Sequence, residues 1–127
     1  MSTLLLNTLT GKTSAGSIVV TGEGGSTTTN LQQGLAKMWA THAGNSTAQD
    51  SFNLTSITDT SAGDFNFNIA NDMSNDDFAA VYSSDQEQSY VTNSDRAVGL
   101  IRAIDKNISG TKVDPNYCSM SVFGDLA

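Results

Sequence analysis

Residues 61–70 read SAGDFNFNIA, and this stretch decides the fold class. From residue 65 to residue 69, apolar side chains alternate strictly with asparagines, which is typical of a β-strand with one buried face. The four residues before them, SAGD, are of the types that form tight turns, so they predict a hairpin. A half-buried strand needs a second layer over its apolar face, so the stretch predicts packed β-structure.

Short strands are predicted along the rest of the chain as well, because β-branched and aromatic residues recur between polar turns. Phe52 and Leu54 are expected to share one strand face, and residues 97–104 form the most apolar segment. Seven or eight short strands at this close spacing indicate a β-sandwich or a barrel. We predict an all-β fold, an antiparallel and jelly-roll-like β-sandwich with an extended N-terminal arm.

The last predicted strand, residues 117–123, alternates almost to the end of the chain. Its inward face is expected to carry Cys118, Met120 and Val122, while the other face has an aromatic residue at each end. Apolar groups on both faces would make a poor exposed edge, so the strand is expected inside a sheet. Cys118 is the only cysteine, so no disulfide can form within the chain, and a buried thiol is expected.

The first 30 residues differ from the rest, because they contain no aromatic residue and only two short apolar runs between polar turns. Two such runs cannot close a core by themselves. We therefore predict an attachment and oligomerisation arm at residues 1–30, followed by a β-sandwich domain at residues 31–127. The residues expected to make the assembly contacts are Leu4, Leu5, Leu6, Ile18, Val19 and Val20.

Charge and composition argue against several classes of function. The 127 residues carry a net charge of −7, and the six basic residues are scattered, which argues against nucleic-acid binding. No apolar run approaches the roughly 20 residues that span a bilayer. The first residues also lack the basic start of a signal peptide. We expect synthesis in a cytoplasm and no membrane insertion.

The stretch LTGKTSAGSIVV, residues 9–20, contains a Gly-Lys-Thr-Ser run like the end of a phosphate-binding loop. The full motif needs a glycine at the position of Leu6 and a helix directly after the loop. A β-branched run follows instead, and it predicts a strand. The segment is therefore predicted to be a polar turn with Lys12 in solvent.

No residues in the sequence form a recognisable catalytic or metal-binding set. His42 is the only histidine, which is too few for a zinc site, so we expect it at the surface or at an interface. Residues 71–77 carry several oxygen ligands but lack the spacing and the glycine of a calcium loop. No Ser–His–Asp set and no carboxylate pair can be placed on a rigid frame. We predict no enzyme activity, no cofactor and no metal.

Aromatic residues on polar strands and loops favour a second function, a carbohydrate-binding module that stacks on sugars of a host surface. The residues considered for glycan or subunit contacts are Trp39, Tyr82, Tyr90 and Tyr117. The alternative places Trp39 in the core and the tyrosines at an interface between subunits, where tyrosine is enriched.

Residues 31–43, LQQGLAKMWATHA, allow two interpretations. Apolar residues at helical spacing and Asn30 as an N-cap favour a helix, which Gly34 weakens in its middle. The alternative is a turn followed by a strand that runs to Thr41, with Trp39 pointing inward.

Five phrases from residue 34 onward resemble, in their order, a domain in virion structural proteins of tailed phages that infect cyanobacteria and other marine bacteria. They are GLAKMW, DSFNLTSITD, GDFNFN, NDMSNDDFAA and VDPNYCSMSVFGD, and they span residues 34–125. Proteins with this domain are described as tail-fibre-like or structural. After Trp39 the sequence has ATHA, where the family has an asparagine and aromatic residues, so no ligand role is carried over to this loop.

The resemblance implies an all-β domain, a homotrimer and a place on the virion surface. It also favours a strand over a helix at AKMW. The implied function is that of a small surface decoration, a head fibre or a tail-fibre-like protein that docks through its N-terminal arm. The implied partners are other copies of the chain and virion proteins of the capsid, neck or tail, with host-surface glycans as a further candidate.

Overall fold

The computed structural model describes residues 3–12, 18–22, 24–44 and 46–127. The chain divides into a smaller unit, residues 1–35, and a larger unit, residues 36–127. The division falls at residue 35, whereas the sequence placed the end of the arm at residue 30. The larger unit is a β-sandwich, and the smaller unit is built around one β-hairpin.

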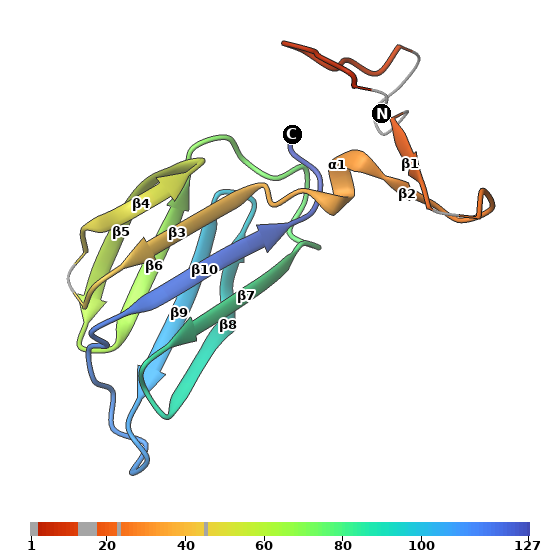
Figure 1. Ribbon diagram of the computed structural model, residues 1–127. Helices are drawn as coiled ribbons and strands as arrows, with labels where there is room; N and C mark the ends of the chain where they lie inside the picture. The colour runs from red at the N-terminus through yellow and green to blue at the C-terminus, as the bar shows by residue number, and fades with distance from the viewer. Residues whose placement is uncertain (1–2, 13–17, 23, 45) are drawn as a thin grey trace. The chain divides into compact units, whose positions relative to one another are not determined.

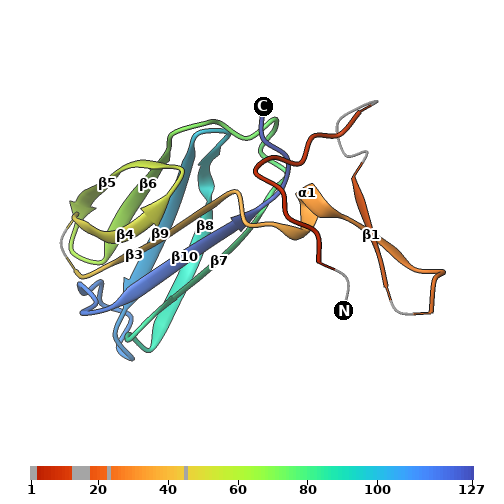
Figure 2. The same cartoon turned by 45° about the horizontal axis from the view of Figure 1, so that its top comes forward.

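The larger unit consists of two antiparallel sheets of four strands each, stacked face to face (Figures 1 and 2). The first sheet contains β3 (Met38–His42), β4 (Ala48–Phe52), β7 (Ala79–Ser84) and β10 (Cys118–Phe123), in the order β4-β3-β10-β7. The second sheet contains β5 (Leu54–Ser61), β6 (Asp64–Ile69), β8 (Gln88–Ala97) and β9 (Leu100–Lys106), in the order β5-β6-β9-β8. The predicted all-β antiparallel sandwich is confirmed.

The strand order does not confirm the jelly-roll detail of that prediction. A jelly roll is wound from two Greek keys, in which strands that are consecutive in the chain pass from one sheet to the other instead of pairing as hairpins. Here β3–β4, β5–β6 and β8–β9 are hairpins, each within one sheet. The connections after β4, β6, β7 and β9 cross to the other sheet.

The hairpin predicted at SAGD forms the turn between β5 and β6, and Gly63 explains its shape. Gly63 has a φ of 64°, a conformation that residues with a side chain rarely adopt. A Cβ atom at this position would lie 2.4 Å from the carbonyl oxygen of Asp105. Glycine is therefore required here both by the backbone conformation and by the close approach of β9.

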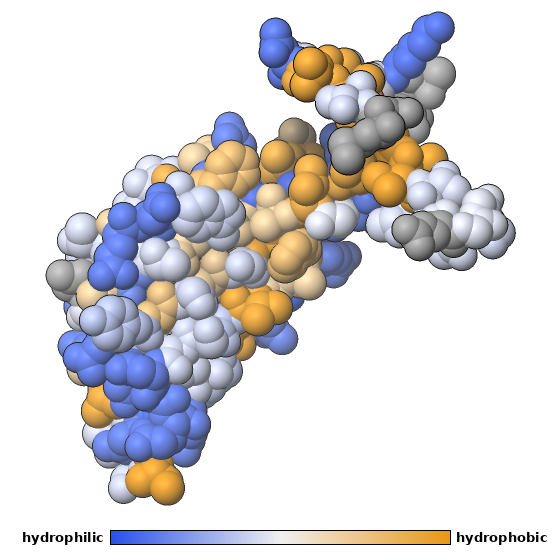
Figure 3. Space-filling view, in the orientation of Figure 1, coloured by the Kyte–Doolittle hydropathy of each residue, from blue (hydrophilic) through white to orange (hydrophobic). Residues whose placement is uncertain are grey.

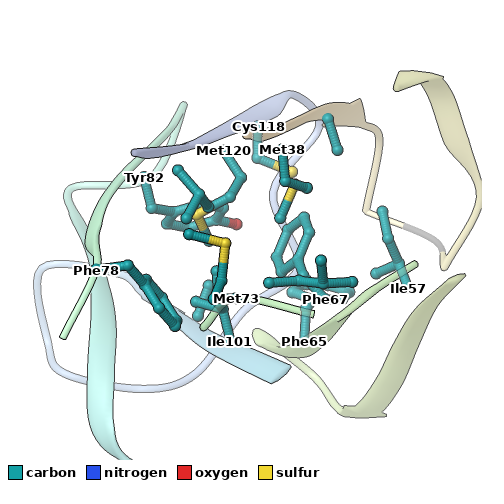
Figure 4. Packing of buried hydrophobic residues seen from close by; sticks show 14 residues of the cluster. Met38, Ile57, Phe65, Phe67, Met73, Phe78, Tyr82, Ile101, Cys118 and Met120 are labelled. Atoms are coloured by element: carbon teal, nitrogen blue, oxygen red, sulfur yellow. The ribbon is translucent and has the colours of Figure 1, made fainter. Parts of the chain in front are cut away.

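The hydrophobic core lies between the two sheets, and both sheets contribute to it (Figure 4). Phe65 and Phe67 of β6 are fully buried, as their alternation predicts. The rings of Phe67 and Tyr82 meet edge to face, with centroids 5.9 Å apart. The buried members of the cluster are Met38, Ala40, Ile57, Phe65, Phe67, Ile69, Met73, Phe78, Tyr82, Ile101, Ala103, Cys118, Met120 and Val122.

The C-terminal strand occupies the inside of the first sheet, as predicted. β10 pairs with β3 on one side and with β7 on the other. Cys118, Met120 and Val122 face the core and are buried. The sequence pattern therefore placed both the strand and its inward face correctly.

Phe52 and Leu54 do not share a strand face, and this prediction was wrong. Asn53 between them has a φ of 55°, which turns the chain from β4 in the first sheet to β5 in the second. Asparagine tolerates this left-handed conformation better than most residues. Its side chain holds the corner, donating to the carbonyl oxygen of Lys37 at 2.9 Å and accepting from the backbone N–H of Asn71 at 2.8 Å.

The two interpretations of residues 31–43 each describe part of the structure. One short helical turn, α1 (Leu31–Gly34), is capped by the Asn30 side chain, which accepts from the N–H of Gln33 at 3.2 Å. The strand β3 follows from Met38, as the turn-and-strand interpretation predicted. Trp39, however, points outward, because successive side chains of a strand face opposite sides and Met38 is buried.

The smaller unit contains β1 (Val19–Thr21) and β2 (Thr28–Asn30), which pair as a two-stranded antiparallel sheet, and then α1. The loop between the strands is closed by a hydrogen bond from the N–H of Gly22 to the carbonyl of Thr27, at 2.8 Å. The prediction of a turn at residues 13–17 falls outside the described residues.

Candidate functional site

The smaller unit exposes its apolar side chains instead of burying them. Among the described residues 3–12, 18–22 and 24–35, none is buried. Leu4 is 80% exposed, and in Figure 3 apolar residues lie open on the surface of this unit. Ile18 is half-buried, and the other exposed apolar residues of the unit are Leu5, Leu6, Leu9, Val19, Val20 and Leu35.

The two units differ sharply in charge. Lys12 and Glu23 are the charged side chains of residues 1–35, and they cancel. The net charge of −7 therefore lies on the sandwich. An apolar, electrically neutral surface and a strongly acidic surface are thus carried by different parts of the same chain.

The outer face of the first sheet is weakly polar over much of its area (Figure 3). Trp39 lies there, half-exposed, and its strand neighbour across the β3–β4 ladder is Phe52. A hollow of about 500 Å³ opens at the end of this face where β10 begins. Its polar lining includes Thr41, Gln49, Ser83, Asp85, Tyr117 and Ser119.

The structure does not gather the four aromatic residues that the sequence grouped as contacts. Trp39 and Tyr117 belong to the outer side of the first sheet, and Tyr117 is 69% exposed. Tyr90 pairs with Ile104 in the second sheet and lies beneath the Lys106 ammonium, 5.5 Å from its ring centroid.

Tyr82 is not a surface contact, which corrects the prediction for this residue. Alternation along β7 turns Tyr82 into the core, where its hydroxyl donates to the carboxylate of Asp105 at 2.6 Å. Asp105 is fully buried and also accepts from the hydroxyl of Ser84 at 2.5 Å. Burial, with the nearby carboxylate, raises the pKa of the Tyr82 phenol above its ordinary range. Tyr82 therefore stays protonated and serves as a donor inside the core.

Cys118 and His42 are also interior residues. Burial raises the pKa of the Cys118 thiol to about 12, so it remains protonated at neutral pH and is a poor nucleophile. The thiol lies 3.1 Å from the carbonyl oxygen of His42. The expectation of a surface or interface position for His42 was wrong, because its ring packs against Phe65 and Phe67 at centroid distances of 4.9 and 5.3 Å.

An ion network covers part of the outer face of the second sheet, and no pattern in the sequence predicted it. Both carboxylate oxygens of Asp64 accept from the guanidinium of Arg102, each at 2.7 Å, and Lys112 bonds the same carboxylate. Arg102 also contacts Asp95. The guanidinium of Arg102 holds the pKa of the Asp64 carboxyl well below its ordinary value. The pairing joins β6, β8, β9 and the loop after β9.

Replacing Asp64 by asparagine is expected to lower the free energy of unfolding at pH 7 by about 2 kcal/mol, since hydrogen bonds to charged groups contribute roughly 1.5–3 kcal/mol. The folded carboxyl has a pKa below its ordinary value of 3.8. The wild-type protein therefore loses this contribution as the pH falls below 3.8 toward the lowered pKa, because the unfolded chain takes up the proton first. Urea unfolding of both proteins at pH 7 and at pH 3 measures the difference.

Asp59→Asn is the matched control, because Asp59 is an exposed aspartate on the neighbouring strand β5. It should leave the stability unchanged within about 0.5 kcal/mol. An Asp64→Asn variant whose deficit is the same at both pH values would contradict the role of the ionised carboxylate.

Two further kinds of functional feature can be judged from the described residues: metal-binding groups and membrane-spanning helices. The described part of the chain holds no group of three or more His, Cys, Asp and Glu side chains that could bind a metal ion. Within the same residues, no helix combines the length and the apolar character needed to cross a membrane.

Comparisons with models of protein families, with curated proteins and with solved structures gave no match to this chain.

Proposed function

We propose that the protein is a structural subunit of a tailed-phage virion, a small surface decoration or a fibre-like protein. It assembles as a homotrimer and attaches to the particle through its N-terminal unit. The observation that carries the proposal is the exposure of the apolar side chains at residues 4–6 and 19–20 in a unit whose described part has no buried residue. Apolar surface gathered in this way marks a contact with another protein.

The distribution of charge supports assembly through this unit. Two sandwich domains of net charge −7 repel each other when they approach within the screening length of about 8 Å. The N-terminal unit has no net charge, so its copies can meet without this cost. Among the described residues, β1 and β2 pair only with each other, so their other edges can pair with strands of other chains through main-chain hydrogen bonds.

The virion context comes from the sequence phrases described above. GDFNFN forms β6, and VDPNYCSMSVFGD contains β10, and both strands lie inside their sheets. These phrases therefore carry the fold itself, which suits a protein whose task is to build a particle surface.

The test is the mass of the full chain in solution, measured by sedimentation at micromolar concentration. The native protein should sediment with three times the chain mass of 13.3 kDa. A variant with Leu4, Leu5 and Leu6 all replaced by serine should sediment as a monomer with an unchanged circular dichroism spectrum. Ile108→Ser is the control, because Ile108 is also 80% exposed but lies on a loop of the sandwich. It should remain a trimer.

A native chain that sediments as a monomer contradicts the trimer, and a triple serine variant that stays trimeric contradicts the role of the N-terminal unit. The virion assignment has its own test. A tag placed after Ala127, an exposed residue, should be visible on purified particles by electron microscopy. If purified particles carry no tagged copy of the protein, the assignment to the virion is contradicted.

A further inference from the structure

We propose that the hollow at the outer face of the first sheet, here called the Tyr117 hollow, binds a neutral sugar unit of a glycan. Its polar lining is formed by Thr41, Gln49, Ser83, Asp85, Tyr117 and Ser119. The inference does not depend on the N-terminal unit or on assembly, so it stands apart from the proposed function.

Tyr117 supplies an aromatic platform at this site. The side chain is 69% exposed although it directly precedes a central strand. The π-face of an aromatic ring carries a partial negative charge. The C–H bonds on one side of a sugar ring carry a partial positive charge, so the two faces attract each other. The exposure of the side chain lets a ligand reach the ring.

Asp85 holds the platform in place. Its carboxylate accepts from the N–H and the side-chain amide of Asn116, both at 2.9 Å, and its own N–H donates to the carbonyl of Tyr117 at 3.1 Å. These hydrogen bonds to the ionised form keep the pKa of the Asp85 carboxyl below its ordinary value. The turn before β10 is thereby tied to the end of β7. Asp85 is thus a positioning residue for Tyr117.

The other lining groups match the hydroxyls of a sugar. The hydroxyls of Ser83 and Ser119 lie 3.0 Å apart, and each can both donate and accept, as sugar hydroxyls do. Gln49 adds an amide with donors and an acceptor. In the β3–β4 ladder Thr41 pairs with Asp50 and His42 with Ala48, so Gln49 is the extra residue of a bulge. Bulges re-aim side chains and are frequent beside binding sites.

Three of the strands that line the hollow are joined by backbone hydrogen bonds, because β10 pairs with β3 on one side and with β7 on the other. The floor of the hollow includes Ser84, whose hydroxyl is held by the buried carboxylate of Asp105, and the buried Cys118. A site that is ordered in advance loses little entropy on binding, which favours a ligand with few apolar contacts.

Charge determines which glycans fit. Asp85 is the charged residue among those that line the hollow, and no basic residue lines it. The sandwich as a whole carries a net charge of −7. Sialylated and sulfated glycans are therefore repelled, and a neutral hexose or N-acetylhexosamine chain is the ligand class. The hollow is wide open to solvent, so a sugar unit at the end or side of a chain can reach it without passing through a narrow entrance.

The test applies the full chain to a printed array that carries neutral, sialylated and sulfated glycans, with a concentration series for every variant. The wild-type protein should bind at least one neutral glycan and none of the acidic ones. Tyr117→Ala should weaken this binding about tenfold or more, while Tyr117→Phe, which keeps the ring, should remain within about threefold. Gln49→Ala should weaken it by several fold.

Tyr90→Ala is the matched control, because Tyr90 is also a tyrosine in contact with solvent but belongs to the second sheet. It should bind like the wild type. The proposal is overturned if no glycan binds at high micromolar concentration, or if acidic glycans bind best. An equal loss for Tyr90→Ala and Tyr117→Ala also overturns it. Circular dichroism of each variant confirms that a loss of binding is not a loss of folding.

Discussion

A chain that ends after Asp114 is expected not to fold. The truncation removes β10, which pairs with β3 on one side and β7 on the other, so the first sheet loses its connection. It also removes the buried side chains of Cys118, Met120 and Val122, each worth about 1.5–3 kcal/mol of burial. Their sum is comparable to the whole stability of an ordinary domain, about 5–15 kcal/mol.

The measurement is circular dichroism with limited proteolysis, which should show no cooperative thermal transition and rapid digestion. A chain that ends after Asp125 is the control. It loses the bridge between Met73 and Leu126 and the hydrogen bond from the N–H of Ala127 to the carbonyl of Asp72, but keeps all of β10. It should fold with a modest loss of stability. A cooperative transition in the shorter chain would contradict the central position of β10.

Phe67→Ala is expected to cost about 3–5 kcal/mol in the free energy of unfolding, the usual range for a buried phenylalanine. Phe67 is fully buried, and its ring meets those of His42 and Tyr82 edge to face. Neighbours from both sheets surround the position, as Figure 4 shows, so the cavity cannot close by the movement of one strand. The expected loss of stability has two parts: the free energy gained by burying the ring, and the cost of the cavity that its removal leaves.

Phe52→Ala provides a matched comparison, because the same substitution is made at a residue that is 52% exposed on the outer face of the first sheet. It should change the stability by no more than about 0.5 kcal/mol. Urea unfolding followed by circular dichroism measures both variants. Similar losses for the two phenylalanines would mean that the inner and outer faces of the sandwich have been assigned wrongly.

The buried polar residues were largely missed at the level of the sequence, although one signal was present. Asp105 follows Ile101 and Ala103 at the spacing of one strand face, so its inward direction could have been predicted from alternation. Its partners could not, because Tyr82 and Ser84 are 23 and 21 residues away and lie in the other sheet. The ion pair between Asp64 and Arg102 could not be predicted either, because it forms only when β6 and β9 lie side by side in the sheet.

The candidate assembly site was predictable in one respect only. The apolar runs at residues 4–6 and 18–20 are visible in the sequence, and so is their separation by polar turns. Their exposure is a property of the folded chain, since the sandwich closes its core without them. The Tyr117 hollow was not predictable as a site, because its lining comes from β3, β4, β7 and β10 and from the residues directly after β7 and before β10.

The sequence by itself determined the all-β class, the hairpin before β6 and the inward faces of β6 and β10. Each of these follows from a local pattern: a period of two or the chemistry of a turn. Only the tertiary structure decided that Trp39 faces outward and that His42 is buried. The segment MWATH has large side chains on both faces, so alternation alone leaves two choices. The choice was made by Phe65 and Phe67 of the opposite sheet, against which Met38, Ala40 and His42 pack, because a shared core selects the face that fits it.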